Sequence, residues 1–441
     1  MFRATEYRRI ATIRAVSVAL ISAVDPYPTD AGKKVVLAGF LEYFADRYGP
    51  QNVHYIRVGG GPPTDFPVVL HTVPGPSRTD LLRALATRVG TGRASLQEAF
   101  LYSPRTRQAV SGLLSQIAPQ LRVYDTVRTA QYAGDDVAAH AICYLDDLFT
   151  DRYSRMLAAA REYPDIDINP LGNFAAHIPR RLRPIADNRF GQTALLRFER
   201  AVVRRSEDRT ARRFRRSLLV NELEARELRR RTGLPDARIQ SIPPLVSAPA
   251  APVRRHDGRP EFVFLGLLSL PHNDDGLQWF LTAVWPQVLH RMPAARLRVI
   301  GREARPGVLR TAEQAGPSVS VEGYVADLDD ALSGAAALVN PLRFGSGIKL
   351  KVIDALGHHL PVVSTSVGAE GIASGPGTGV LVADDAAGLA ESLCSLTDPG
   401  RNADCSAEAA EHFRTTYARP AVFARYAVAF SPEEISGSGG G

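Results

Sequence analysis

The stretch from Pro341 to Leu356 (PLRFGSGIKLKVIDAL) combines residue types suited to holding a phosphate group. An apolar run ends at Asn340, a loop with two glycines follows, and a helix is expected over 348–356. Glycines let the backbone approach a ligand closely, and the first turn of a helix presents unpaired N–H groups and the positive end of the dipole. Lys349 places a cation there, which is unfavourable for the helix unless an anion is bound. The pattern predicts a phosphate site; a tight loop with a solvated lysine is the alternative.

Carboxylates of two kinds accompany this loop. Asp354 lies five residues after Lys349, where it could accept hydrogen bonds from ribose hydroxyls or be an ordinary surface acid. Asp146 and Asp147 follow the apolar run 139–145, so we expect them at the carboxyl end of a buried strand, where ligands bind in open α/β sheets. Adjacent side chains of a strand point in different directions. Only one acid should therefore face substrate, while the other caps the next helix or is solvated.

These residues lie in an alternation of strand-like and helix-like segments, which predicts parallel sheets. In the first half, a helix is expected over 33–48 and strands over 13–21, 53–58, 121–124, 139–145 and 217–220. Residues 248–260, rich in Pro, Ala and charge, are the best linker. After them, helices over 275–291, 327–332 and 348–356 alternate with strands over 261–267, 297–300, 319–321, 336–340 and 361–365. The chain should fold as two doubly wound α/β domains facing a cleft.

Composition fits two folded domains in a reducing compartment. The chain has 441 residues, of which 45% are hydrophobic and 22% charged, so extensive disorder is not expected. Its three cysteines are scattered and show no C-x-x-C spacing, which argues against a disulfide framework and a structural zinc site. The apolar run 15–24 follows a basic start and can mimic a signal peptide, but it is interpreted as a buried first strand. We therefore expect a cytoplasmic protein.

Positive charge is concentrated in one segment. The net charge is +7, and residues 197–216 alone hold nine arginines against three acids. The segment is interpreted as a solvated helix face, or as a patch for an anionic membrane surface or a phosphorylated acceptor. Nucleic acid is not an expected partner, because no recognition module is visible and aromatic residues do not alternate with the basic ones.

Several segments resemble a known enzyme family. Residues 344–372 (FGSGIKLKVIDALGHHLPVVSTSVGAEGI) resemble the donor-site signature of the retaining glycosyltransferase family 4. FLGLLSLPHNDDGLQWFLTAVWP (264–286), LRVIG (297–301) and VEGYVADLDDAL (321–332) resemble other parts of its C-terminal domain. DPYPTDAGKK (25–34), YLDDLFTDRY (144–153) and RIQSIPPLV (238–246) resemble, more weakly, its first loop, mid-domain loop and hinge entry. The resemblance covers about 400 residues, a span typical of two domains.

The resemblance implies the GT-B fold and a hexosyltransferase-type glycosyltransferase (EC 2.4). An N-terminal acceptor-side domain is expected over 1–246, a C-terminal donor domain over 261–414, a helix crossing back over 415–430, and a flexible tail over 431–441. The enzyme would move a sugar, with retention, from a nucleotide-diphosphate sugar such as a UDP-sugar to an unidentified small-molecule, lipid-linked or glycan acceptor. Catalytic roles are implied for Asp146 and Asp147. Donor contacts are implied for Gly32, Asn273, Tyr324, Gly345, Ser346, Gly347, Ile348, Lys349, Asp354 and Glu370.

The sequence departs from the family pattern at three places. The family often has two glutamates eight positions apart, where this chain has Ser346 and Asp354. Many members carry an arginine and a lysine after the first C-domain strand, whereas this chain has Leu267 and no following lysine. Asn273 and Lys349 are expected to take over part of that role. Asp146 stands where a histidine commonly precedes the aspartate of the mid-domain loop.

No metal and no cofactor are expected. Asp327-Leu328-Asp329 matches the letters of a D-x-D metal motif but opens an expected helix, so we interpret it as capping. His358 and His359 are adjacent and would point to different faces of a helix. Helix N–H groups and a cation would instead stabilise the leaving nucleoside diphosphate. The competing interpretations are a degenerate GT-B partner protein without transferase activity and a GT-B epimerase.

Overall fold

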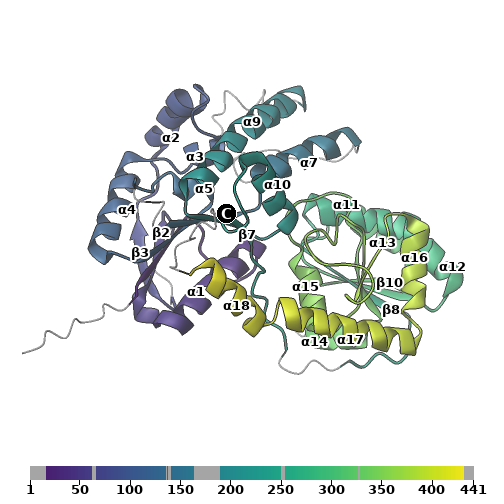
Figure 1. Ribbon diagram of the computed structural model, residues 1–441. Coiled ribbons are helices and arrows are strands. Elements are labelled where there is room, and N and C mark those ends of the chain that lie inside the picture. Colours follow the sequence, from purple (N-terminus) through teal and green to yellow (C-terminus); the bar gives the residue numbers. More distant parts are fainter. Residues whose placement is uncertain are drawn as a thin grey trace, which may run out of the picture.

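Two parallel sheets organise the chain. The computed structural model describes residues 16–61, 66–135, 137, 141–162, 189–249, 254–325 and 328–431. Within these residues the strands up to Ser241 form one sheet, and those from Glu261 onward form a second. Every strand pairing is parallel. Each sheet is flanked by helices, and the two units lie next to each other (Figure 1). This is the Rossmann-like, two-domain GT-B architecture expected from the sequence.

The N-terminal sheet has seven strands among the described residues. Their order is β3 (Val69–Val73), β2 (Val53–Val58), β1 (Val18–Ser22), β4 (Leu121–Asp125), β5 (Ala141–Asp146), β6 (Arg216–Leu219) and β7 (Ile239–Ser241). Helices of this half are α1 (Gly32–Tyr48), α2 (Arg78–Ala84), α3 (Leu96–Ala99), α4 (Pro104–Ile117), α5 (Thr126–Ala130), α7 (Phe149–Glu162), α9 (Arg189–Arg213) and α10 (Glu222–Thr232). Most residues of the central strands are buried because helices cover both faces of the sheet.

The C-terminal sheet has six strands among the described residues. Their order is β10 (Val319–Gly323), β9 (Arg296–Ile300), β8 (Glu261–Leu265), β11 (Ala337–Asn340), β12 (Val362–Ser364) and β13 (Val380–Val382). Helices of this half are α11 (Pro271–Trp279), α12 (Trp285–Arg291), α13 (Pro306–Gln314), α14 (Leu328–Gly334), α15 (Leu350–Gly357), α16 (Ala386–Ser395), α17 (Pro399–Thr416) and α18 (Arg419–Ala429).

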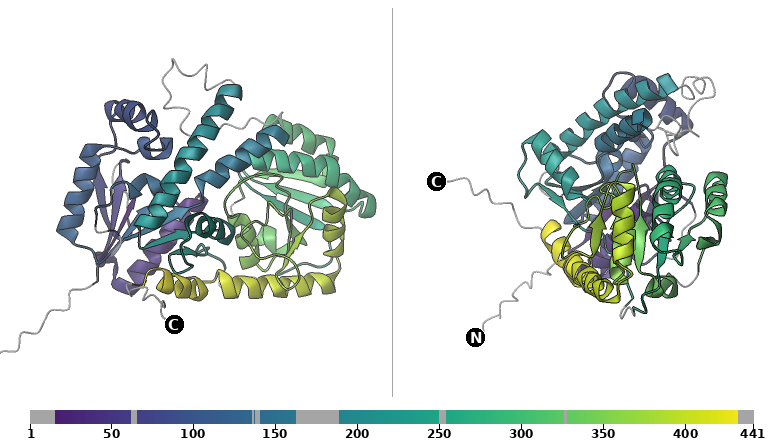
Figure 2. Two further views of the ribbon diagram at one scale, coloured as in Figure 1. Left: turned by 45° about the horizontal axis from the view of Figure 1, so that its top comes forward. Right: turned by 90° about the vertical axis from the view of Figure 1, so that its right-hand side faces the viewer.

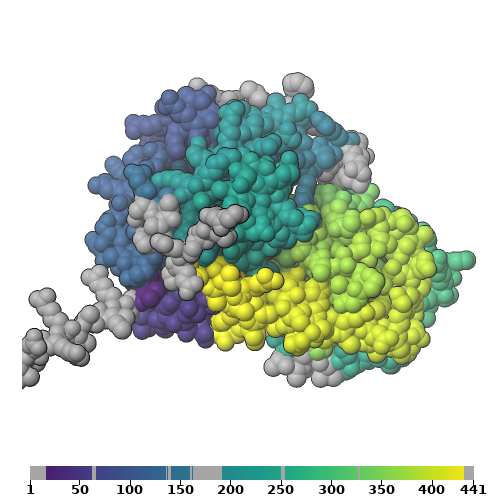
Figure 3. Space-filling model, viewed as in Figure 1, coloured from purple at the N-terminus to yellow at the C-terminus, as the bar shows by residue number. Residues whose placement is uncertain are grey.

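The last helix leaves the C-terminal sheet and covers the N-terminal one. Alternate residues of β1 enter two different cores: Ala19 and Ile21 pack with α4, α7 and α9, whereas Val18 and Leu20 pack with α1 and α18. Figure 2 shows α17 and α18 running almost in line beneath both halves, and Figure 3 shows them as a continuous band that reaches α1. The far end of the chain therefore completes the first core.

Some element boundaries differ from the sequence-based expectation. The helix expected over 275–291 begins earlier, at Pro271, and is interrupted by a π-helical turn, Phe280–Val284, before α12. Pro286 has no N–H to donate, so the hydrogen-bond ladder must rearrange ahead of it. The helix expected over 348–356 begins at Leu350, with Lys349 as its N-cap. Expectations for the N-terminal basic residues, for Asp327 and for most of the tail lie outside the described residues.

Candidate active site

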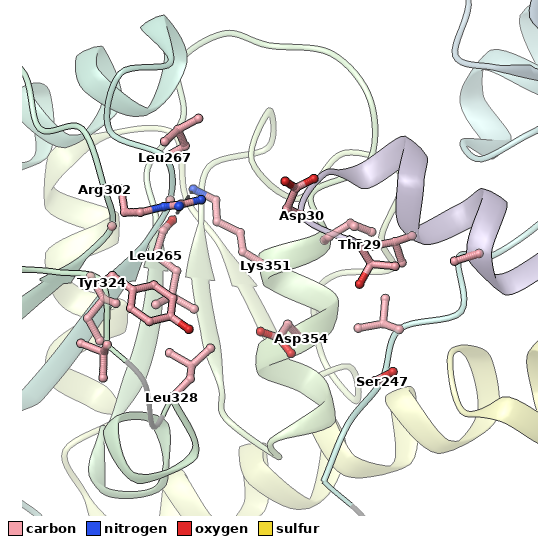
Figure 4. A pocket seen from close by; sticks show the side chains of 18 of the residues that line it. Thr29, Asp30, Ser247, Leu265, Leu267, Arg302, Tyr324, Leu328, Lys351 and Asp354 are labelled. Atoms are coloured by element: carbon pink, nitrogen blue, oxygen red, sulfur yellow. Dashed lines mark hydrogen bonds between the residues drawn. The ribbon is translucent and has the colours of Figure 1, made fainter. Parts of the chain in front are cut away.

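A cavity of about 700 Å³ lies between the two halves, at the carboxyl ends of both sheets. Its N-domain wall comes from the loop before α1, including Thr29 and Asp30, and from α1 itself. Its C-domain wall includes Arg302, Lys351 and the residues after β8 and β10. Figure 4 shows Arg302 and Lys351 directed toward one end of the cavity. A cavity of this size is in the range of small-molecule sites.

Two helix N-termini face each other across the cavity. A methyl group added to Gly32, the first residue of α1, would lie 3.7 Å from Leu350 Cδ1, at the start of α15. Neither helix has a side-chain N-cap or an acidic residue in its first turn. Both therefore keep unpaired N–H groups and the positive ends of their dipoles directed at the same space, which is a favourable environment for an anion.

All lysines of the chain lie at these two helix starts. The sequence contains four lysines among its 53 basic residues: Lys33 and Lys34 in the first turn of α1, and Lys349 and Lys351 at the start of α15. A cation at a helix N-terminus costs about 0.3–1 kcal/mol through the dipole. Lys33 is already paired with Asp125 at 2.7 Å and Lys34 with Asp30 at 2.8 Å. Lys349 and Lys351 form no ion pair with a described residue, so the start of α15 keeps a positive charge that favours an anion.

Lys351 is the lysine that lines the cavity, and it was not among the residues expected to contact the donor. Its ammonium donates to Leu265 O and to Asn273 Oδ1, both at 3.0 Å, and lies 4.6 Å from the centre of the Phe264 ring. Burial, with a smaller contribution from the charge of Lys349, lowers the pKa of Lys351 to about 7. The predicted residue Asn273 thus contacts the cation rather than the cavity itself.

Lys349 has a different position from Lys351. Its ammonium donates to Gly347 O at 2.6 Å and to Ser346 O at 3.2 Å, within its own loop. Burial lowers its pKa to about 8, and it is not one of the residues that line the cavity. Lys349 therefore stabilises the glycine loop by donating to its carbonyl groups, while Lys351 extends from the first helical turn into the cavity.

The rest of the glycine loop connects the two domains. Gly345 and Gly347 have φ values of 143° and 72°, which a residue with a side chain rarely adopts. Ile348 packs against the cores of both halves. Arg155 of α7 donates to both carboxylate oxygens of Glu370, in the C-domain, and to Gly345 O at 3.4 Å. Glu370 is thus an interdomain anchor for the loop in this structure.

Asp354 and Tyr324 line the end of the cavity away from Lys351 (Figure 4). Burial raises the pKa of the Asp354 carboxyl, and the neighbouring His358 partly offsets this effect. Tyr324 follows Gly323 at the end of β10 and is 74% exposed, so its ring is free to cover a ligand. Leu328, at the start of α14, provides an apolar surface between them.

The paired acids after β5 lie on the N-domain side of the cleft. Asp146 adopts a left-handed backbone conformation (φ 71°), and its Oδ1 accepts a 2.7 Å hydrogen bond from Tyr144. Lys33 Nζ is 3.8 Å from Asp146 Oδ2, and burial raises the pKa of the Asp146 carboxyl. Asp147 Oδ2 accepts from Arg152 Nε at 3.0 Å and lies 3.9 Å from the position of a methyl group added to Gly347. Both acids therefore lie near the cleft, on different sides of the strand end.

Sequence reasoning missed Lys351 and Arg302. The signal for Lys351 was the spacing Lys-Leu-Lys at the expected start of a helix, which leaves open which lysine lies inside the first turn. Arg302 lies just after the end of β9, separated from it by Gly301. It lines the cavity, and its charge helps to lower the pKa of Asp30 on the opposite wall, after the larger effect of Lys34.

Two further findings concern the described residues. They contain no group of three or more histidine, cysteine, aspartate or glutamate side chains arranged to hold a metal ion. None of their helices has both the length and the apolar character needed to cross a membrane.

Comparisons with known proteins give the family of the C-terminal half. Residues 259–398 match the family described as glycosyl transferases group 1. A segment of 130 residues is 32% identical to an uncharacterized 44.6 kDa protein in the cps region of Klebsiella pneumoniae. That match spans 28% of this chain and 33% of the relative's length.

Solved structures share the fold over nearly the whole chain. Sucrose-phosphate synthase from Thermosynechococcus elongatus superposes with a TM-score of 0.60 and 14% identity, over 94% of this chain and 98% of that one. Staphylococcus aureus TarM, in a complex containing UDP, superposes at 0.60 with 9% identity, over 94% and 100%. Anabaena HepE with UDP and glucose superposes at 0.56 with 10% identity, over 94% and 99%. Residues 259–398 therefore form a glycosyl transferases group 1 domain within a chain that has the two-domain GT-B fold.

Proposed function

We propose that the protein is a glycosyltransferase that moves a sugar from a nucleoside-diphosphate sugar to an acceptor hydroxyl. The observation that carries this proposal is the cavity between two uncapped helix N-termini at which all four lysines gather. The group 1 domain that forms one wall supports the same activity. Two structural neighbours, TarM and HepE, were solved in complexes that contain UDP, so UDP is the first probe to use.

The proposed donor spans the cavity from end to end. Its diphosphate would lie at the N-termini of α1 and α15, within reach of Lys351 and Arg302. Its ribose hydroxyls would donate to Asp354, and Tyr324 would cover the base. As the bond to the sugar breaks, negative charge grows on the departing diphosphate, and the helix N–H groups and cations are already placed to stabilise it. This chemistry uses no metal ion.

Finer features of the reaction are proposals as well. The resemblance to family 4 supports transfer with retention and an acceptor-side domain over 1–246, a donor domain over 261–414 and a returning helix over 415–430. Donor contacts by Gly32, Asn273 and Glu370 and by the loop Gly345–Lys349 remain predictions. None of these residues lines the cavity in this structure, so we expect them to act by positioning the residues that do line it.

A labelling experiment tests the donor site directly. Each of the four lysines can be followed separately by amine acetylation and peptide mass spectrometry, because each helix start contributes only two. We expect UDP to protect Lys351 more strongly than Lys349, because Lys351 faces the cavity. In titration calorimetry, Lys351→Met should weaken UDP binding by about 1.5–3 kcal/mol, the usual value of a charged hydrogen bond.

The pH dependence has a defined sign. Burial lowers the pKa of Lys351 to about 7, so its positive charge is present below that pH and is lost as the pH rises through it. UDP affinity of the wild type should therefore fall from about pH 6 to pH 9, and Lys351→Met should show a smaller fall. The control is Arg291→Met, which removes one exposed positive charge on α12 and should leave UDP affinity unchanged. Equal affinities for wild type and Lys351→Met, without protection of Lys351, would contradict the proposal.

A further inference from the structure

His358, at the end of α15, connects two elements that line the proposed nucleoside end of the cavity. Its Nδ1 lies 2.8 Å from Asp354 O on its own helix, and its Nε2 lies 2.8 Å from Asp329 Oδ1 on α14. The imidazole is buried, with a side chain only 8% exposed, whereas the Asp329 side chain is 69% exposed. Asp354 Oδ1 lies 3.7 Å from Nδ1 on the same side.

Both ring nitrogens of His358 face acceptors only. A backbone carbonyl cannot donate, so Nδ1 must carry a proton to make its hydrogen bond. A solvent-exposed carboxylate is also an acceptor, so Nε2 must carry a proton to bond Asp329. A neutral imidazole has a proton on only one nitrogen, and either tautomer would leave one of these two contacts without a hydrogen. The two contacts together therefore require the doubly protonated imidazolium.

The position of this cation relates it to the cavity. Asp354 and Leu328 both line the cavity, and they belong to the two helices that His358 connects. His358 is also the neighbouring group that favours the charged form of the buried Asp354 carboxyl. A positive His358 therefore favours the ionised form of Asp354 and holds α14 against α15.

We propose that His358 is a positioning residue for the nucleotide donor. As an imidazolium, His358 ties Asp329 to the helix that carries Asp354. Donor affinity therefore depends on the protonation of His358. The inference rests on the proposed function, because the ligand positioned is the proposed nucleotide. Charged and titratable groups facing His358 among the described residues are Asp354 on α15, Asp329 on α14 and the adjacent His359. Asp330, next to Asp329, is paired with Arg255.

The expected pH effect follows from the charge. The imidazolium makes both hydrogen bonds, and loss of either ring proton leaves one of them without a hydrogen. The test measures UDP affinity by calorimetry from about pH 5.5 to pH 8.5 for the wild type and for His358→Gln, a neutral side chain of similar reach. Dividing the wild-type affinity by that of the variant removes the effects that both proteins share, such as the titration of the phosphate and of the lysines. We expect a ratio of about two- to fivefold at the low end, the range of a partly exposed ion pair, and near one at the high end.

Two variants and a spectrum complete the design. Asp329→Asn keeps an exposed residue at the surface, and its affinity ratio to the wild type should change with pH as that of His358→Gln does. His359→Asn is the control: His359 has a left-handed backbone conformation (φ 57°) that asparagine tolerates, and its profile should match the wild type. Nitrogen NMR of labelled histidine in the ligand-free protein should show both His358 nitrogens protonated near pH 6.

The outcomes separate the two proposals. Wild-type protein that does not bind UDP at any pH would overturn the donor site and this inference together. UDP binding with a pH-independent ratio for both His358→Gln and Asp329→Asn would overturn the inference and leave the donor site standing. A neutral His358 at pH 6 in the NMR spectrum would overturn it as well, even if one of the variants failed to fold.

Discussion

At the residue scale, the two acids after β5 have different environments. Asp146 is partly exposed and is bonded by Tyr144, with Lys33 of α1 nearby, so it faces the helix start at the proposed diphosphate. Asp147 is buried and its Oδ2 is bound by Arg152, while its Oδ1 has no hydrogen-bond partner among the described residues. Of the two, Asp146 is the better placed to orient a substrate hydroxyl, and Asp147 is the more structural.

A substitution at Asp146 should therefore affect turnover more than donor binding. We expect Asp146→Asn to lower kcat by about tenfold to a hundredfold, because a misplaced reactant costs up to a hundredfold, while the Kd for UDP stays within about twofold. Steady-state kinetics on a hydrolysed or transferred UDP-sugar, together with calorimetry, gives both values. Equal losses in kcat and in UDP affinity would contradict a role on the acceptor side.

Asp147→Asn serves as the comparison. It weakens the pair with Arg152, whose side chain is 39% exposed, so we expect a loss of about 1 kcal/mol in stability. The loss should appear first as a lower thermal midpoint.

At the element scale, α9 presents arginines on its exposed face. Four of the nine arginines in residues 197–216 are used inside the fold: Arg209 bonds Glu98, Arg213 and Arg216 donate to backbone carbonyls, and Arg215 also has a partner. The other five are exposed and form no ion pair with a described residue: Arg197, Arg200, Arg204, Arg205 and Arg212. Phe198, 41% exposed, lies among them. This arrangement supports the proposed contact with an anionic membrane surface.

The contact can be measured by co-sedimentation with vesicles that contain phosphatidylglycerol. Each basic residue near an anionic surface contributes about 1 kcal/mol, so we expect the wild type to bind at low salt and to be released as salt screens the attraction. Changing Arg204 and Arg205 to Glu should abolish the binding. The matched control changes Arg291 and Arg310, exposed on C-domain helices, to Glu. Absence of low-salt binding by the wild type, or the same loss in both double variants, would leave α9 as a solvated face.

At the scale of the whole molecule, α18 contributes side chains that complete one core of the N-terminal domain. Phe430, directly after α18, packs against Phe40 and Phe44 of α1, with ring centres 5.1 and 4.8 Å apart. Tyr426 is fully buried and its hydroxyl donates to Pro243 O at 3.0 Å. Arg216 of β6 donates to carbonyls at the end of α18. The N-terminal domain thus depends on contacts with residues between 183 and 390 positions further along the chain.

Removing one ring from this contact should destabilise the N-terminal half. We expect Phe430→Ala to lower the free energy of unfolding by about 3–5 kcal/mol, because it leaves a cavity in a fully packed core. Urea denaturation followed by tyrosine fluorescence measures this change. Val428→Ala is the control on the same helix, since Val428 is 62% exposed and its loss should cost less than about 0.5 kcal/mol. Similar midpoints for the two variants would show that α18 only rests on the surface.

Local patterns in the sequence were sufficient to predict much of this architecture. The apolar runs at β1 and β11, bounded by turns, indicated buried parallel strands, because a strand covered on both faces is mostly apolar. The glycine loop before α15 indicated a helix start at a strand end, and the spacing of Asp354 placed its carboxylate on that helix. These features depend only on neighbouring residues, which is why a single sequence contains them.

Tertiary structure decided which side chains meet. The helix α15 starts at Leu350 rather than at Ile348, which the sequence pattern could not show. Because a helix turns about 100° per residue, this start makes Lys349 the N-cap and directs Lys351 into the cavity. The bond from His358 to Asp329 and the packing of Phe430 on α1 join residues distant in the chain. Composition and periodicity report how each segment faces its surroundings, whereas such contacts depend on how the segments pack against one another.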